Sequence, residues 1–556
     1  MRKNTVVIFL LSLLTSSLSN AQPTTVKNAV KGVFSLQTFR DDGSLLATSH
    51  GVFISENGEA VSELKPFLGA KRAVIIDQRG AKAEVKRMIG VDPIYDVARF
   101  SVDTKSTAIQ IAKTKAQVGS KAWLVGYALK NPEIKETTIK SVEPFGNQFS
   151  YYIFGMNAPD NAVACPMVNA DGDLIGLLQV STTSFDTHAT DAAYIKTLSV
   201  NGLSYNDPTL SQIAIPLALP QNEQQAQLAL MMATQSGDSL KYAAAAEDFI
   251  AAYPTMRDGY EALARLQMSY FHFNEANQTM ERALKNVANK DESHYDFARI
   301  ILDKELNMPQ ASYEQWNLDK AMSEASAAYD LNPVPIYKHL QARILYAQGD
   351  FQQACSTFKA LSLDKSFATP ELLYQQAQCK LMTDTDKKEA IALLDSAINA
   401  TDTLRIVEAA PYFYTRAQAY EATDSFRQAV FDYTRYEILC NGRVSADFYF
   451  IREQAEVKGR LYKQALSDIA RAIILAPQEP TYYAEMAQLQ LRFNQIEEAV
   501  QTARRCTEIN PNYPEGWLVY GLALAKNGDK ATGLESMRKA KELGNSQAEE
   551  LIKKYE

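Results

Sequence analysis

The sequence predicts a multidomain chain in which an all-β domain is followed by an all-α array of helical hairpins. Three observations lead to this fold class. Short β-prone runs separated by turn residues fill residues 29–204. From Gln221 onward the apolar residues recur with a helical period, and similar segments return about every 34 residues. A short apolar stretch precedes both regions.

Residues 1–21 have the pattern of a secretory signal peptide. Arg2 and Lys3 give a positive start, residues 6–14 are apolar, and Ser19 and Ala21 supply the small residues of a cleavage site. The apolar run is shorter than the roughly 20 residues that span a bilayer. We therefore expect a protein exported to the bacterial periplasm or cell envelope, with no integral membrane span in the mature chain.

The composition argues against nucleic-acid binding and against metal or disulfide sites. The chain has 556 residues with 65 acidic and 57 basic side chains, so its formal net charge is −8. A mildly acidic protein repels phosphate backbones, which argues against a nucleic-acid partner. The sequence has only 5 His and 5 Cys, without a CxxC or a Cys/His cluster. We therefore expect no cofactor, no metal and no disulfide framework.

The β-prone runs lie close together and alternate with Gly, Asn and Asp. This spacing favours a barrel or a sandwich. The runs cover residues 32–39, 51–54, 73–76, 83–89, 97–102, 121–125 and 174–180.

Four blocks in this region, residues 51–62, 92–102, 125–127 and 166–176, resemble in their order the trypsin-like serine peptidases of the HtrA type. The resemblance implies a trypsin-like double barrel over residues 22–213. A linker over residues 214–224, stiffened by two prolines, is expected to follow it.

The resemblance also shows which catalytic residues are replaced. The position of the catalytic His falls on Lys65, that of the Asp on Asp96, and that of the Ser on Val163. A valine has no nucleophilic atom. Ala164 and Cys165 replace the two glycines that follow the serine, and neither adopts unusual backbone conformations as readily as glycine. The resemblance therefore implies a peptidase-like domain without peptidase activity.

Cys165 leaves one alternative open. It lies in the loop of the nucleophile, although two residues beyond the nucleophile's position. The domain has two histidines, His50 and His188, and neither stands in the register of the catalytic base. A Cys–His pair needs only proximity in space, so the alternative is a peptidase that uses Cys165.

The second region resembles the tetratricopeptide repeat (TPR). Trp517 and Gly521 fall at its large and small positions in the last unit, and Pro511 falls at the proline position of the unit before it. A small residue at the start of each second helix lets the two backbones of a hairpin approach, where a larger side chain would overpack. These small residues are Ala245, Ala276, Ala321, Ala354, Ala390, Ala429, Ala465, Ala499 and Gly533.

Nine such hairpins over residues 225–556 predict a solenoid with a continuous core. Resemblance to TPR proteins implies that a groove of this solenoid binds protein or peptide partners. The leading hypothesis is an exported interaction or scaffold protein with an inactive peptidase-like domain. In the alternative, the array recruits substrates for a peptidase centred on Cys165. A third hypothesis is a homo-oligomer assembled through the repeats.

Overall fold

The computed structural model describes residues 22–146, 148–179, 186–383 and 387–556. The expected signal peptide lies outside the described residues. The chain divides into two compact units, residues 1–300 and 301–556. Among the described residues, no helix is both long enough and apolar enough to cross a membrane.

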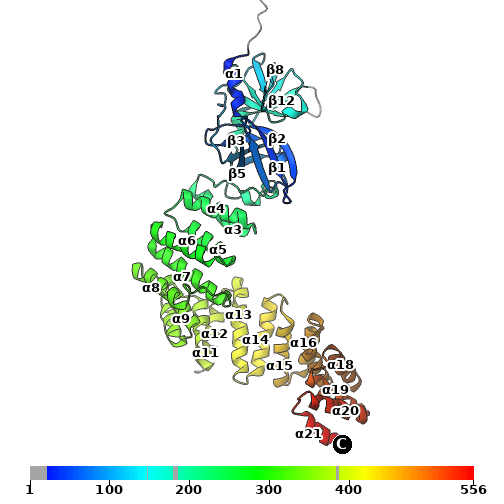
Figure 1. The fold of residues 1–556 in the computed structure, drawn as a ribbon. Helices are drawn as coiled ribbons and strands as arrows, with labels where there is room; N and C mark the ends of the chain where they lie inside the picture. The colour runs from blue at the N-terminus through cyan, green and yellow to red at the C-terminus, as the bar shows by residue number, and fades with distance from the viewer. Residues whose placement is uncertain (1–21, 147, 180–185, 384–386) are drawn as a thin grey trace, which may run out of the picture. The chain divides into compact units, whose positions relative to one another are not determined.

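Two closed antiparallel barrels begin the first unit (Figure 1). The first barrel has the strand order β1-β2-β3-β6-β5-β4, and the second has β10-β11-β12-β9-β8-β7. The strands are β1 (Val33–Phe39), β2 (Leu45–Phe53), β3 (Glu59–Ser62), β4 (Arg72–Ile76), β5 (Lys82–Asp92), β6 (Val97–Val102), β7 (Lys121–Val125), β8 (Ile134–Phe145), β9 (Phe149–Phe154), β10 (Pro166–Val168), β11 (Leu174–Gln179) and β12 (Thr187–Asp191). This architecture is the expected trypsin-like double barrel.

Aromatic side chains fill the first barrel. The Phe100 ring lies 6.2 Å from the Phe34 ring and 5.0 Å from the Phe67 ring, measured between centroids. Such tilted and edge-on contacts add to the stabilisation from burial. A second apolar cluster joins the two barrels, and it includes Val97 of β6 and Trp123 of β7. Two short helices, α1 (Thr24–Ala29) and α2 (Ala192–Ile195), also pack against it.

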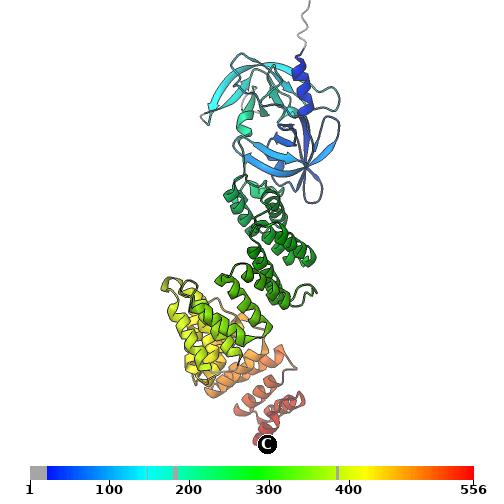
Figure 2. The same ribbon diagram turned by 90° about the vertical axis from the view of Figure 1, so that its left-hand side faces the viewer.

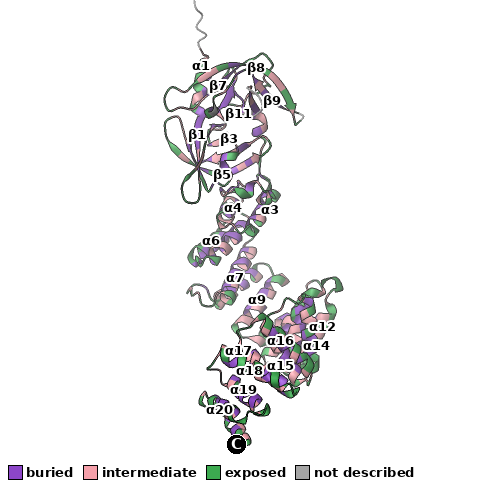
Figure 3. Ribbon diagram, turned by 90° about the vertical axis from the view of Figure 1, so that its right-hand side faces the viewer, coloured by how far each residue is buried: buried purple, intermediate pink, exposed green. Residues whose placement is uncertain are grey.

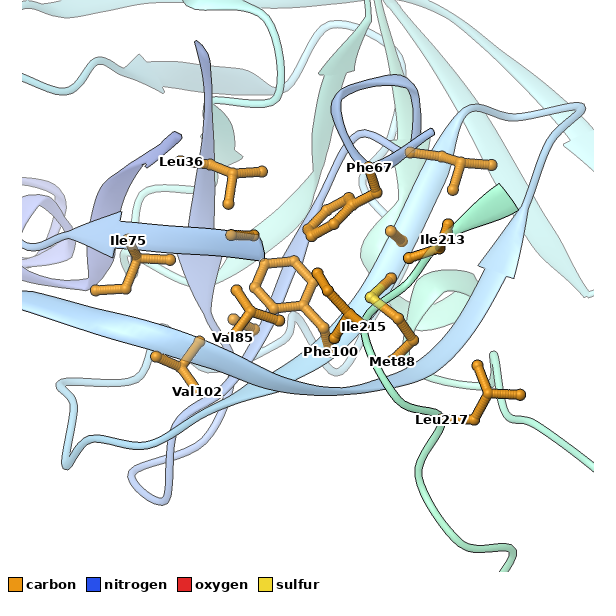
Figure 4. Close-up of a cluster of buried hydrophobic side chains, with 14 of the residues drawn as sticks. Leu36, Phe67, Ile75, Val85, Met88, Phe100, Val102, Ile213, Ile215 and Leu217 are labelled. Carbon is orange, nitrogen blue, oxygen red and sulfur yellow. The ribbon is translucent and has the colours of Figure 1, made fainter. Parts of the chain in front are cut away.

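The segment expected to be a linker begins inside the first barrel. Ile213, Ile215 and Leu217 are buried among Phe67, Met88 and the other core residues (Figure 4). The backbone of Met88 donates to Pro216 O at 2.9 Å and accepts from Ala218 N at 2.8 Å. We call residues 210–217 the plug. In the sequence, this segment was interpreted as the boundary between two domains. In the structure, its alternating apolar residues belong to the barrel core because they cover one end of the barrel.

Helices of the repeat region begin in the first unit with α3 (Glu223–Gln235), α4 (Ser239–Ala252), α5 (Asp258–Ser269) and α6 (Phe273–Asn286), and α7 (Lys290–Asn307) spans the boundary to the second unit. The first of them contact the barrel. The Arg87 guanidinium of β5 binds the Asp248 carboxylate of α4 through two hydrogen bonds of 2.7 and 3.0 Å. The amide N–H of Gly202 donates to Gln225 Oε1 of α3 at 2.9 Å.

The second unit continues the series of hairpins (Figure 2). Its helices are α8 (Leu318–Leu331), α9 (Pro335–Gln348), α10 (Phe351–Ser362), α11 (Pro370–Met382), α12 (Lys387–Ala400), α13 (Ala410–Glu421), α14 (Phe426–Leu439), α15 (Ala446–Lys458), α16 (Tyr462–Leu475), α17 (Pro480–Arg492), α18 (Ile496–Ile509), α19 (Pro514–Lys526), α20 (Lys530–Glu542) and α21 (Ala548–Tyr555). Buried residues gather on the helix faces that pack against neighbouring helices (Figure 3).

The turn inside each of several hairpins holds one residue in the left-handed region. Gly349 and Gly528 take this role with φ of 85° and 95°. Asp424, Arg460 and Asn494 occupy the same place in other hairpins, with φ between 56° and 61°. The hairpin geometry therefore imposes this conformation even where the residue is not glycine.

Candidate functional site

The cleft between the two barrels contains the three positions expected for a catalytic triad. It has a volume of about 300 Å³. Lys65 and Asp96 line it from the first barrel, and Val163 lines it from the second. We call this pocket the cleft. Its other lining residues are Glu63, Ile94, Val97, Ala164, Leu177, Leu178 and Gln179.

Lys65 and Asp96 form an ion pair. The Lys65 ammonium lies 3.2 Å from Asp96 Oδ2, and the other carboxylate oxygen accepts the backbone N–H groups of Leu64 and Lys65 at 3.1 and 2.9 Å. Asp96 has a φ of +50°, which aims its carboxylate at the start of the short 3-10 helix over residues 65–67. The side chains thus join the end of β3 to the start of β6. An ammonium in this place offers no imidazole nitrogen to take a proton from a nucleophile.

Val163 follows a 3-10 turn over residues 160–162 and ends the loop expected to carry the nucleophile. Ala164 has a φ of +60°, in the left-handed region, and its N–H donates to Leu178 O of β11 at 2.9 Å. The loop therefore keeps a conformation that favours glycine, although alanine occupies it. The side chain that this loop presents to the cleft is an isopropyl group.

Cys165 points away from the cleft. Its side chain is 1% exposed and packs among Met167, Ile175 and other residues inside the second barrel. Burial raises the pKa of the Cys165 thiol to about 12, and a hydrogen bond with the backbone of Tyr127 offsets only part of this effect. A buried thiol with a raised pKa is a poor nucleophile because the thiolate is the reactive form.

His50 lies close to the nucleophile loop, which its place in the sequence did not predict. Burial lowers the pKa of the His50 imidazole, while a hydrogen bond with the backbone of Val163 acts in the opposite direction. The imidazole ring also lies 5.7 Å from the ring of Tyr127. His188 lies apart from it on β12, with its ring 5.6 Å from that of Tyr151.

Glu63 is a cleft residue that sequence reasoning missed. Burial raises the pKa of its carboxyl, and the Ser49 hydroxyl donates a hydrogen bond to it. Glu63 directly follows β3, so the only signal in the sequence is its position two residues before Lys65. Within the described residues, no group of three or more His, Cys, Asp or Glu is placed to hold a metal ion.

The small residues singled out in the repeats are all buried. The eight alanines from Ala245 to Ala499 are at most 2% exposed. Gly521 and Gly533 face each other in the last hairpin, where a Cβ on Gly533 would lie 2.8 Å from Gly521 O. The backbones of α19 and α20 therefore approach too closely for any side chain at either position. Trp517, partly buried, donates its indole N–H to Pro511 O at 2.8 Å.

Comparison with known proteins gives likenesses to both regions of the chain. A tetratricopeptide repeat model matches residues 480–513, which hold α17 and α18. A solved structure of the HtrA-type protease AlgW with a tripeptide is similar to the chain at 16% sequence identity, with a TM-score of 0.28. This likeness covers 32% of the present chain and 64% of that chain. No curated protein matches the sequence. The repeat match thus falls on one helical hairpin of the array, and the strands over residues 33–191 form two closed antiparallel barrels.

Proposed function

We propose that the chain is an exported protein-interaction or scaffold protein whose TPR array binds protein or peptide partners, and whose peptidase-like domain is catalytically inactive. The proposal that the peptidase-like domain is inactive rests on the residues that line the cleft. Val163 stands where a nucleophile is needed, and Lys65 is engaged with Asp96 at 3.2 Å. An aliphatic group and an ion pair thus stand at the positions that the resemblance to trypsin-like peptidases assigns to the catalytic residues.

Exposed apolar side chains on two second helices support the interaction role. Phe431 and Ile438 lie seven residues apart on α14 and are 62% and 57% exposed, while Ile474 on α16 is 77% exposed. The two helices meet nearby, because Arg471 Nη1 lies 3.2 Å from Glu437 Oε1. Large exposed apolar residues on neighbouring helices favour an interaction surface when they lie side by side.

A photocrosslinking amino acid placed in the full-length chain tests the interaction role. We expect crosslinks to other envelope proteins from Phe431 and Ile474. The matched control is Leu45, an apolar residue of β2 that is 50% exposed. Crosslinks from Leu45 alone would move the interaction site to the barrels. Crosslinks from Phe431 only to further copies of this chain would favour the homo-oligomer.

Labelling with serine- and cysteine-directed active-site probes tests the absence of catalysis. We expect no labelling in the cleft and no cleavage of a fluorescent casein substrate. Labelling and cleavage that disappear together in the Cys165→Ala variant would instead establish the peptidase whose repeats recruit substrates.

A further inference from the structure

Two cysteines of the second unit lie on helices that follow each other in the array and pack together. Cys355 belongs to α10, the second helix of one hairpin, and Cys379 belongs to α11, the first helix of the next hairpin. Both are free thiols, and both belong to one apolar cluster with Phe358 and Leu372. Cys379 is fully buried, whereas Cys355 is partly exposed. The chain therefore places two thiols at one contact between successive hairpins.

Contacts between the two helices fix their register. The side-chain amide of Gln376 donates to Phe358 O at 3.5 Å, so these two residues lie opposite each other. Because a short loop over residues 363–369 joins α10 to α11, the helices run antiparallel. One turn back along α10 reaches Cys355, and one turn forward along α11 reaches Cys379. The Cys355 sulfur lies 4.0 Å from Gln376 O, which agrees with this register.

The corresponding positions in a later pair of hairpins also pack together. Cys355 directly follows the small residue that opens α10, and Cys379 lies near the end of α11. Val430 of α14 and Ala455 of α15 occupy these positions further along the array, and they share one apolar cluster. Residues that face each other across such a helix contact bring their Cα atoms to within about 6 Å. This is the separation that a disulfide spans.

From this geometry we propose that Cys355 and Cys379 form a disulfide, which links the hairpin α9–α10 to the hairpin α11–α12 when the chain meets an external disulfide as oxidant. A single link of this kind differs from the framework of several bridges that the sequence argues against. The inference rests on the proposed export only for the supply of oxidant, because exported proteins meet an oxidising environment. The link fixes how two successive hairpins stack, and so it fixes the shape of the array at this point.

The exchange proceeds in two balanced steps. The Cys355 thiolate attacks one sulfur of the external disulfide, so that a mixed disulfide forms and the other half leaves as a thiolate. The Cys379 thiolate then attacks the Cys355 sulfur, which closes the protein disulfide and releases the second half. The two released thiolates take up the two thiol protons, and two electrons pass from the protein to the oxidant. Burial raises the pKa of Cys379 to about 12, so we expect the second step to be slow in the folded chain.

Oxidation of the purified full-length mature protein tests this proposal. The protein is kept in native buffer with oxidised glutathione, its remaining thiols are blocked, and it is digested with trypsin without reduction. We expect mass spectrometry to find the tryptic peptides 344–359 and 366–380 joined, with the loss of two hydrogens, and to find them separate after dithiothreitol. Glutathione that stays on Cys355 without joined peptides, or preferred pairing of other cysteines, would overturn the proposal.

Thermal melts measure whether the disulfide links the hairpins. Closing the loop between Cys355 and Cys379 restricts the unfolded chain, so we expect oxidation to raise the midpoint of the second unit's unfolding by about 5 °C. Cys355→Ala and Cys379→Ala keep the contact small and apolar, and each should abolish both the joined peptides and the shift. Cys440→Ala is the matched control, because it removes another partly exposed thiol of this unit and should leave both unchanged.

The outcomes separate this inference from the proposed export. An unchanged midpoint in the oxidised protein, or a shift that persists in Cys355→Ala, contradicts the link between the hairpins in any compartment. A disulfide that forms in the purified protein but is absent from the protein taken directly from cells would confirm the geometry and count against export to an oxidising environment.

Discussion

A buried carboxyl of the repeats leads to a quantitative prediction for Glu456→Gln. Glu456 of α15 is 3% exposed, and its Oε2 atom has no hydrogen-bond partner within the described residues. The nearby Arg452 is already occupied, since it binds Asp468 at 2.6 and 3.0 Å and Glu437 at 2.7 Å. Burial, and then the negative charge of Asp468, raises the pKa of Glu456 to about 8.

The sign and size of the effect follow from proton linkage. The ordinary pKa of 4.5 applies in the unfolded chain, so between that value and about 8 the folded state holds one extra proton. The stability contributed by this proton is fully present below the unfolded pKa and is lost as pH rises through the folded pKa. The loss amounts to about 1.4 kcal/mol per pH unit. Gln has the shape of the neutral carboxyl and no such dependence. We therefore expect Glu456→Gln to gain about 3 kcal/mol relative to the unsubstituted protein between about pH 5.5 and about pH 7.5.

Hydrogen exchange followed by mass spectrometry measures this difference locally. Peptides from α15 are compared between variant and unsubstituted protein at each pH, so that the intrinsic exchange rates cancel. The control is Glu535→Gln on α20, an exposed glutamate for which we expect no pH-dependent difference. A protection ratio that is the same at both pH values, or a variant less protected at about pH 7.5, would refute the reasoning.

Four further predictions concern the core, the loop and the hairpins. Ile215→Ala removes a plug residue that is 2% exposed, so we expect a loss of about 2–5 kcal/mol in urea unfolding of the barrels, against little change for the exposed Leu203→Ala. Because burial raises the pKa of Cys165 to about 12, iodoacetamide at neutral pH should leave it unmodified in the folded protein and modify it in urea, as read by mass spectrometry; modification of the folded protein contradicts this. Gly533→Ala should lower the free energy of unfolding by about 1–3 kcal/mol, since its Cβ meets Gly521 O at 2.8 Å; an unchanged melting temperature argues against the close crossing. Arg460→Gly should stabilise the array by about 1 kcal/mol, because φ is +61° at this exposed residue; lower stability in thermal melts would show that the arginine makes a compensating contact.

The sequence predicts the helical region more completely than the strands. Each hairpin repeats the same pattern of small residues, and so Ala429, Ala465 and Ala499 could be predicted to be buried without any knowledge of long-range contacts. The predicted runs did not include β3, β8, β9, β10 or β12. Lysine and glutamate interrupt β8, and its pairing with β7 and β9 depends on residues far along the chain. Such pairings have no local signature.

The candidate site was also predicted only in part from the sequence. The order of the blocks placed Lys65, Asp96 and Val163, which do meet in one cleft. Local sequence gave no indication that His50 contacts the backbone of Val163, because that contact depends on how the second barrel packs against β2. The direction of Cys165 was likewise left open, since a one-residue step along a strand moves a side chain between core and surface.

Because the plug lies far along the chain, the first barrel can be completed only late in synthesis. Strands β1 to β6 leave the ribosome before residues 210–217, which cover the barrel's end from far along the chain. Until then Phe67 and Met88 lack their partners, and the barrel exposes apolar surface on one side. This apolar surface therefore stays exposed until the second barrel and residues 210–217 have been synthesised. The first helices, which follow the plug at once, then fold against a newly closed barrel.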